Sequence, residues 1–299
     1  MAALSFQRFL RDRYPSLKAQ HADVGQRRKT RLRVIDEFWK LDPLARAAPP
    51  PSIESSETSA ACDTDEDTYD DISSPDSPNL GIIVRTDYAN EDAWKTFYLT
   101  LLEAEKELIV DSEPPANASE PGTSAPAAPT ASSEDVDMAD IPSGDGEDED
   151  EDDADEPLAF FAVLEDEPAL LTGLSNIGAL RLVNDVSVRA APALPEGQKR
   201  RASPGHRLVD MDGLQECYFG KTVWVYDAQS NTDGCVRLVN QHADLYGTAT
   251  GDSWRARASH ITELQVNLTS GAMKIDFGGL DRYDYAERRR NLAMVELPL

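Results

Sequence analysis

Cysteine, histidine and glycine-rich loops are scarce in this sequence. Three cysteines and four histidines in 299 residues provide no disulfide framework, no Cys-x-x-Cys pair and no pair of histidines at the spacing of metal ligands. No glycine-rich phosphate-binding motif is present either. We therefore expect no metal site and no cofactor, and no residue is predicted to be catalytic.

Long apolar runs are also absent. No stretch approaches the roughly eighteen apolar residues of a membrane span, and the first residues lack the apolar core of a secretory signal. These absences predict an intracellular protein, cytoplasmic or nuclear, that does not enter a membrane. Only 7% of the residues are aromatic and 40% are hydrophobic, so a single modest core is expected.

Charge is plentiful and unevenly distributed. Residues 1–46 contain 11 Lys and Arg against 5 Asp and Glu, residues 47–156 contain 3 against 32, and residues 157–299 contain 15 against 18. The chain therefore has a basic start, a strongly acidic middle and a nearly neutral remainder.

Two acidic segments are rich in Pro, Ser, Asp and Glu and show no hydrophobic periodicity. Such segments cannot bury enough apolar surface to offset an ordering entropy of about 1–2 kcal/mol per residue. We predict that residues 47–79 form a disordered acidic linker and that residues 109–157 form a disordered acidic insertion.

The remaining sequence alternates between strand and helix patterns. An apolar run at 81–85 predicts a buried strand, and apolar residues at helical spacing predict a helix over 91–108. One strand and one helix bury too little surface to be stable alone. We therefore expect residues 80–108 and 158–299 to form one discontinuous α/β or α+β domain, preceded by a basic helical segment at 1–46. Further strands are predicted at 158–164, 222–226, 235–239 and 254–258, and helices at 169–183 and 283–294.

Short motifs are spread over residues 81–108 and 158–285. They are Ile83-Val84-Arg85-Thr86-Asp87-Tyr88 with Trp94, Glu165-Asp166-Glu167-Pro168-Ala169 with Gly173-Leu174, Val223-Trp224-Val225-Tyr226-Asp227-Ala228, Trp254-Arg255-Ala256, Asn267-Leu268, and Ile275-Asp276-Phe277. Together they resemble an uncharacterised domain-of-unknown-function family of actinobacteria and fungi. The acidic insertion and a basic loop at 192–207 are departures from that family. No reaction is assigned to it, so the resemblance implies a fold and no chemistry.

The basic start of the chain shows a second pattern. Phe9, Pro15, His21, Asp23, Trp39, Lys40 and Leu41 are spaced like the first two helices of an HMG box. The third helix of such a box is missing, and polyproline follows at Pro49. A nucleic-acid-binding or nuclear-import cluster is predicted within this segment, and the alternative is a solvated helix face. The cluster consists of Arg27, Arg28, Lys29, Arg31 and Arg33.

Two aspartates each follow a predicted strand. Asp87 and Asp227 could line a ligand crevice, because ligands of open α/β sheets bind at the carboxyl ends of strands. Arg85, Thr86 and Arg255 would complete that crevice. The alternative interpretation is that both aspartates cap turns or helix starts.

Several serines have the surroundings of kinase substrates. Ser74 and Ser77 precede prolines, Ser133 lies beside acidic residues, and Ser203 follows two arginines and precedes a proline. A phosphate at any of them would add about −1.5 to −2 charges.

The sequence as a whole favours a non-catalytic protein-interaction module with regulated, disordered acidic arms and a protein partner. One alternative is a nuclear or chromatin-associated protein that binds nucleic acid weakly through residues 1–46. Another alternative is an enzyme that uses the crevice near Asp87 and Asp227.

Overall fold

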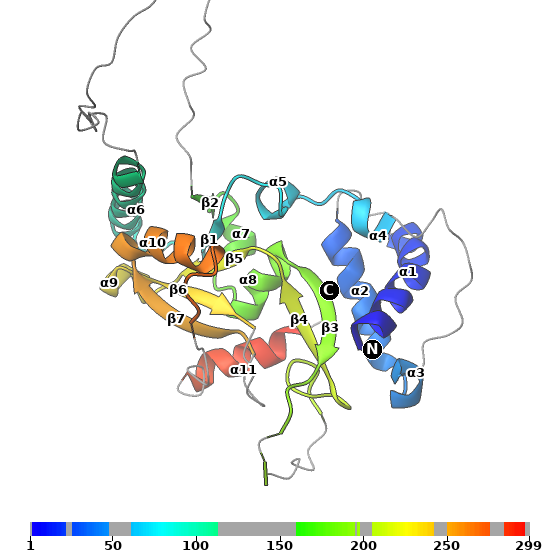
Figure 1. Ribbon diagram of the computed structural model, residues 1–299. Helices are drawn as coiled ribbons and strands as arrows, with labels where there is room; N and C mark the ends of the chain where they lie inside the picture. The colour runs from blue at the N-terminus through cyan, green and yellow to red at the C-terminus, as the bar shows by residue number, and fades with distance from the viewer. Residues whose placement is uncertain are drawn as a thin grey trace, which may run out of the picture.

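The computed structural model describes residues 2–21, 26–47, 61–112, 160–194, 196–197, 205–241, 250–275 and 284–296. Within these residues, a central sheet with helices on both faces is joined to a group of N-terminal helices (Figure 1). The predicted insertion lies almost entirely outside the described residues, as do Ser133 and Ser203.

The larger sheet has five strands in the order β2-β1-β5-β6-β7. Strands β2, β1 and β5 are parallel, and Ile83 of β1 is in register with Val163 on one side and Trp224 on the other. Strands β6 and β7 continue the sheet in antiparallel fashion. The strands are β1 (Gly81–Arg85), β2 (Phe161–Leu164), β5 (Thr222–Tyr226), β6 (Cys235–Asn240) and β7 (Asp252–Arg257).

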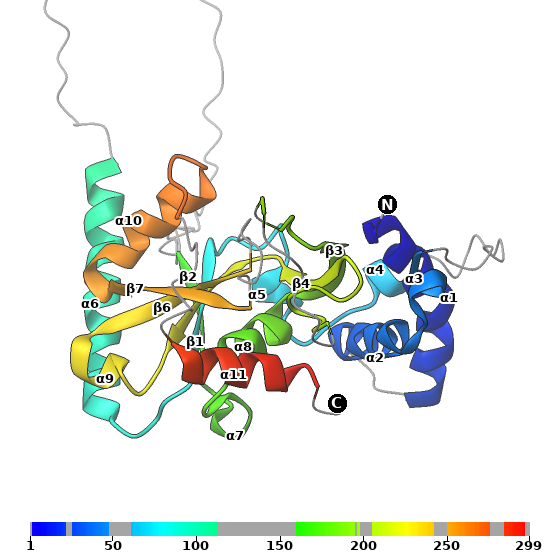
Figure 2. The same ribbon diagram turned by 90° about the horizontal axis from the view of Figure 1, so that it is seen from below.

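Successive side chains of β1 point to opposite faces of this sheet. Ile83 packs against Trp94 and Phe97 of α6, whereas Ile82 and Val84 belong to the core on the other side. The first face is covered by α6 (Glu91–Ser112) and α10 (Ala258–Thr269), and the second by α8 (Asn176–Val183), against which α11 (Tyr285–Met294) packs (Figure 2). Because both faces are covered, β1 is buried along its whole length.

The predicted α/β class is confirmed. The parallel pairing of β1 with β2 joins the chain before the insertion to the chain after it in one sheet. Short helices α7 (Pro168–Leu171) and α9 (Ser230–Asp233) lie in the connections. The helix expected over 169–183 is interrupted at Gly173, whose φ of 70° is a left-handed conformation that glycine adopts without strain.

A two-stranded antiparallel hairpin joins this sheet to the N-terminal helices. It consists of β3 (Asp185–Ala190) and β4 (Leu214–Phe219), and it was not predicted. The helices α1 (Ala2–His21), α2 (Arg27–Lys40) and α3 (Pro43–Ala47) pack beside it through Phe6, Leu10, Ile35 and Phe38, all at most 1% exposed.

The buried carboxylate of Glu216 links this helical group to the hairpin. It accepts a hydrogen bond of 2.6 Å from Trp39 Nε1 and forms an ion pair of 2.7 Å with Arg207. Arg207 also pairs with Asp36 of α2 at 2.7 Å. The described residues of the segment 1–46 are therefore mainly helical, as predicted, and they pack onto the α/β body.

The prediction of a disordered linker over 47–79 is wrong for residues 61–79, which we call the acidic strap. The acidic strap contains α4 (Ala61–Thr64) and α5 (Asp70–Ser73) and runs from the N-terminal helices to β1. Cys62, 1% exposed, anchors it in the core. Its acidic residues pair with arginines of α2, and composition alone did not show that these partners exist.

None of the helices in the described part of the chain is both long enough and apolar enough to cross a membrane.

Candidate binding sites

All five residues of the predicted crevice meet at the carboxyl ends of β1 and β5. Thr86 Oγ1 donates a hydrogen bond of 2.9 Å to the carbonyl of Tyr226, which binds the two strand ends together. Arg255 reaches across from β7 and donates to both carboxylate oxygens of Asp227 at 2.9 and 3.1 Å. The sequence therefore identified a real cluster of residues.

The arginines of this cluster are neutralised by Asp227 and by carboxylates beside the cluster. The side chain of Arg85 is 4% exposed and forms ion pairs with Glu91 at 2.5 Å and Glu165 at 3.3 Å. Its guanidinium also lies over the rings of Tyr88 and Trp94, at 4.4 and 4.8 Å from their centroids. Arg85 is thus enclosed by carboxylates and aromatic rings, and its role is to hold these neighbours together.

Both aspartates make the hydrogen bonds of turn caps. Asp227 Oδ1 accepts from the backbone N–H of Ser230 at 3.0 Å, and Asp87 Oδ1 accepts from that of Ala89 at 3.0 Å. Burial would raise the pKa of Asp227, but hydrogen bonds from Arg255 and the charge of Arg237 outweigh it and lower that pKa. Asp227 is therefore a stable anion with fixed partners, which matches the capping interpretation of these residues.

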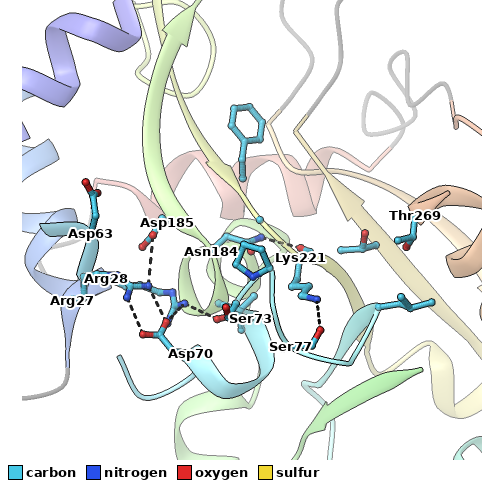
Figure 3. A pocket seen from close by; sticks show the side chains of 17 residues that line it. Arg27, Arg28, Asp63, Asp70, Ser73, Ser77, Asn184, Asp185, Lys221 and Thr269 are labelled. Atoms are coloured by element: carbon cyan, nitrogen blue, oxygen red, sulfur yellow. Dashed lines mark hydrogen bonds and ion pairs between the residues drawn. The ribbon is translucent and has the colours of Figure 1, made fainter. Parts of the chain in front are cut away.

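Three arginines of the predicted basic cluster are buried in ion pairs, and Figure 3 shows two of them, Arg27 and Arg28. Arg27 donates twice to Asp70 at 2.8 Å, and Arg28 pairs with both Asp67 and Asp70. Arg31 pairs with Asp185 of β3 at 3.0 Å. The side chains of these three arginines are only 7–11% exposed, so they do not form an open basic surface. Lys29 and Arg33 are half-buried.

A polar cavity of about 700 Å³ lies between α2, the acidic strap and the start of β5 (Figure 3). Ser74 and Ser77 line it, and Lys221 Nζ donates to the carbonyl of Ser77 at 3.2 Å and to that of Asn79 at 2.6 Å. Burial lowers the pKa of Lys221. The charged residues in the lining are balanced in sign: Arg27, Arg28 and Lys221 against Asp63, Asp70 and Asp185.

A second cavity, about 500 Å³ in volume, is mainly apolar, and we call it the apolar groove. It lies where α2 and the acidic strap meet α7, α8 and α11. Its apolar residues are Leu32, Leu170, Leu174, Leu182 and Met294. Charged residues also line it, namely Arg28, Lys29, Asp67, Glu167 and Arg181. Leu170 is 44% exposed.

A third cavity of about 380 Å³, which we call the edge groove, lies along β7 and α10. It is lined by Trp254, Arg255, Ala256, Arg257, His260, Glu263, Leu264, Asn267 and Met273. Of these, the sequence analysis had singled out Arg255 as a site residue. Four of the others lie on a helix that was not predicted. Residues 260, 263, 264 and 267 have the spacing of one helix face directly after a predicted strand, and this spacing could have identified them.

Comparison with known proteins gives no relative. No protein family, no curated protein and no solved structure matches this chain. In the described part of the chain, no group of three or more His, Cys, Asp or Glu side chains could hold a metal ion.

Proposed function

We propose that this chain is a non-catalytic protein-interaction module and that its apolar groove is the docking site for a protein partner. The observation that carries the proposal is a cavity of about 500 Å³ whose surface is mainly apolar, with four leucines and a methionine in its lining, in a protein with a net charge of −26. Binding cavities are typically apolar with a few polar groups, and they favour junctions between structural units. The apolar groove lies at such a junction, between the N-terminal helices and the α/β body.

The two alternative functions have less support from the geometry. Nucleic-acid binding through residues 1–46 requires exposed arginines, and Arg27, Arg28 and Arg31 have acidic partners. An enzyme acting at Asp87 and Asp227 requires groups free to bind or protonate a substrate, and these carboxylates cap turns. We therefore favour the interaction module.

We further propose membership of the domain-of-unknown-function family that the motifs resemble. The proposal is supported by the places where those motifs lie. The first begins on β1, the second spans α7, the third includes β5 and the fourth lies on β7. Motifs that belong to one family domain are expected to lie in one folded body, and three of these four lie on strands of the five-stranded sheet.

A peptide library displayed on phage and selected on the full chain tests the docking site. Leu170→Glu places a charge in the apolar groove at a residue exposed enough to tolerate it. Burying a leucine side chain contributes about 1.5–3 kcal/mol. Groove-binding peptides should therefore bind the variant at least about tenfold more weakly.

The matched control is Leu99→Glu on α6, which introduces the same change at a leucine that is 60% exposed and outside the apolar groove. Both variants should melt at the temperature of the parent chain. The proposal fails if the library yields no binder, or if all selected peptides bind the Leu170 and Leu99 variants equally well.

A further inference from the structure

We propose that the edge groove binds an extended acidic segment of a partner protein as an additional strand on β7. This is a second binding site, which does not depend on the apolar groove. Four observations support it: the edge position of β7, backbone groups of β7 that no described residue pairs, the shape of the edge groove and the exposed Arg257 within it.

Strand β7 is the last strand of the five-stranded sheet and pairs only with β6 among the described residues. Figures 1 and 2 both show it at the border of the sheet, with α10 beside it. An edge strand presents a row of unpaired N–H and C=O groups that another chain can use.

The register identifies which backbone groups face outward. The N–H of Ala258 donates to the carbonyl of Gly234 at 3.2 Å, and Cys235 is opposite Arg257. Ala258 is therefore opposite Gly234 in a hydrogen-bonded pair. Hydrogen-bonded pairs alternate with non-bonded pairs along an antiparallel ladder, so the even-numbered residues of β7 also bond to β6. Ser253 and Arg255 therefore direct their N–H and C=O groups to the free edge, and no described residue bonds to them.

The edge groove follows this free edge. It is lined by four consecutive residues of β7, from Trp254 to Arg257. Because neighbouring side chains of a strand point to opposite faces, a cavity that contacts four in a row must run along the edge. The opposite wall is one face of α10, given by residues 260, 263, 264 and 267. A groove between an edge strand and a helix is the geometry in which extended peptides bind by strand addition.

The side chains favour a peptide with acidic and apolar residues. Trp254, Leu264 and Met273 provide apolar contacts. Two charged side chains of the edge groove are exposed and have no ion-pair partner among the described residues: Arg257 at the end of β7 and Glu263 on the wall formed by α10. Arg255 is already held by Asp227 and Asp233, so a peptide carboxylate would have to lie beside Arg257 and away from Glu263. A carboxylate on the peptide would give Arg257 the partner it lacks.

A second copy of this chain is a poor occupant. Each copy carries a net charge of −26, and a net charge far from zero keeps a protein monomeric. We therefore assign the site to a partner and not to self-pairing.

The test uses the full chain and a displayed library of eight-residue peptides. The selected peptides that bind the edge groove should alternate acidic and apolar residues. Methylating the backbone nitrogens that face β7 removes their donors, and binding should fall by more than about tenfold. Methylating the alternate nitrogens, which face away, should change binding little.

Arg257→Glu should weaken these same peptides by about fivefold to tenfold, because it replaces an attraction by a repulsion. The matched control is Arg289→Glu on α11, another exposed arginine with no ion-pair partner among the described residues and outside the edge groove. Leu170→Glu should leave these peptides bound, which separates this site from the apolar groove.

Four results would overturn the proposal. The first is a library that yields no acidic binder, and the second is binding that does not change when the peptide backbone is methylated. The third is equal peptide binding by the Arg257 and Arg289 variants. The fourth is a concentration-dependent dimer of the parent chain that the Arg257 variant does not form. The last result would identify a second copy of the chain as the occupant.

Discussion

Replacing Glu105 by glutamine should stabilise this protein at neutral pH and leave it unchanged in acid. Glu105 lies on α6, is 7% exposed, and accepts backbone hydrogen bonds from Phe160 and Phe161 at the start of β2. Burial raises the pKa of this carboxyl from 4.5 to about 7, although those hydrogen bonds oppose the rise. Glu105 therefore anchors the point where the chain rejoins the sheet after residues 113–159.

The pH dependence follows from the direction of this shift. Between pH 4.5 and about pH 7 the folded protein holds a proton at Glu105 that the unfolded chain releases. The free energy of unfolding must then fall as the pH rises through this window, and it levels off above it. A shift of this size corresponds to roughly 3 kcal/mol at 1.36 kcal/mol per pH unit.

The variant Glu105→Gln keeps an oxygen that can accept the same hydrogen bonds and never becomes charged. Its free energy of unfolding should equal that of the parent at pH 4.5 and exceed it by up to about 3 kcal/mol at pH 8. Urea denaturation at four pH values from 4.5 to 8 measures the difference. The control is Glu103→Gln on the exposed face of the same helix. If the difference in unfolding free energy between Glu105→Gln and the parent is the same at all four pH values, the assignment of the proton to Glu105 is refuted.

Three further predictions concern packing and ion pairs. Trp94→Ala should lower the free energy of unfolding by about 3–5 kcal/mol, because this side chain is 4% exposed and its ring lies 4.8 Å from that of Tyr226. Trp39→Phe should cost about 1–3 kcal/mol, because it leaves the buried Glu216 without one of its donors. Asp70→Asn should destabilise the protein by up to about 3–5 kcal/mol, because this carboxylate is shared by two arginines of α2.

Chemical denaturation of the full chain measures all three changes. Tyr285→Ala, at a side chain that is 70% exposed, is the control for loss of an aromatic ring and should change stability by less than about 0.5 kcal/mol. Asp92→Asn, at the exposed start of α6, is the control for loss of a carboxylate. An unchanged midpoint for Trp94→Ala or Trp39→Phe would mean that the ring is not packed as described. A stability loss for Asp70→Asn no larger than that for Asp92→Asn would show that the acidic strap does not hold α2.

Local sequence determined the central sheet and its principal helix. The apolar run of β1 and the apolar stripe of α6, with Trp94 and Phe97 on it, are sufficient to specify a buried strand followed by a covering helix. The gathering of Arg85 and Asp227 was also predictable, because residues that follow parallel neighbouring strands meet at one edge. What these residues do there was left open between binding and capping until their partners were known.

Tertiary structure alone decided the rest. The acidic strap has the composition of a disordered segment, and it is ordered because Asp67 and Asp70 meet arginines about forty residues earlier in the chain. The same contacts turn an apparently open basic cluster into a buried one. Trp39 and Glu216, 177 residues apart, attach the N-terminal helices to the hairpin. Composition and periodicity report only on near neighbours along the chain, whereas each of these features depends on a partner that folding brings from far away.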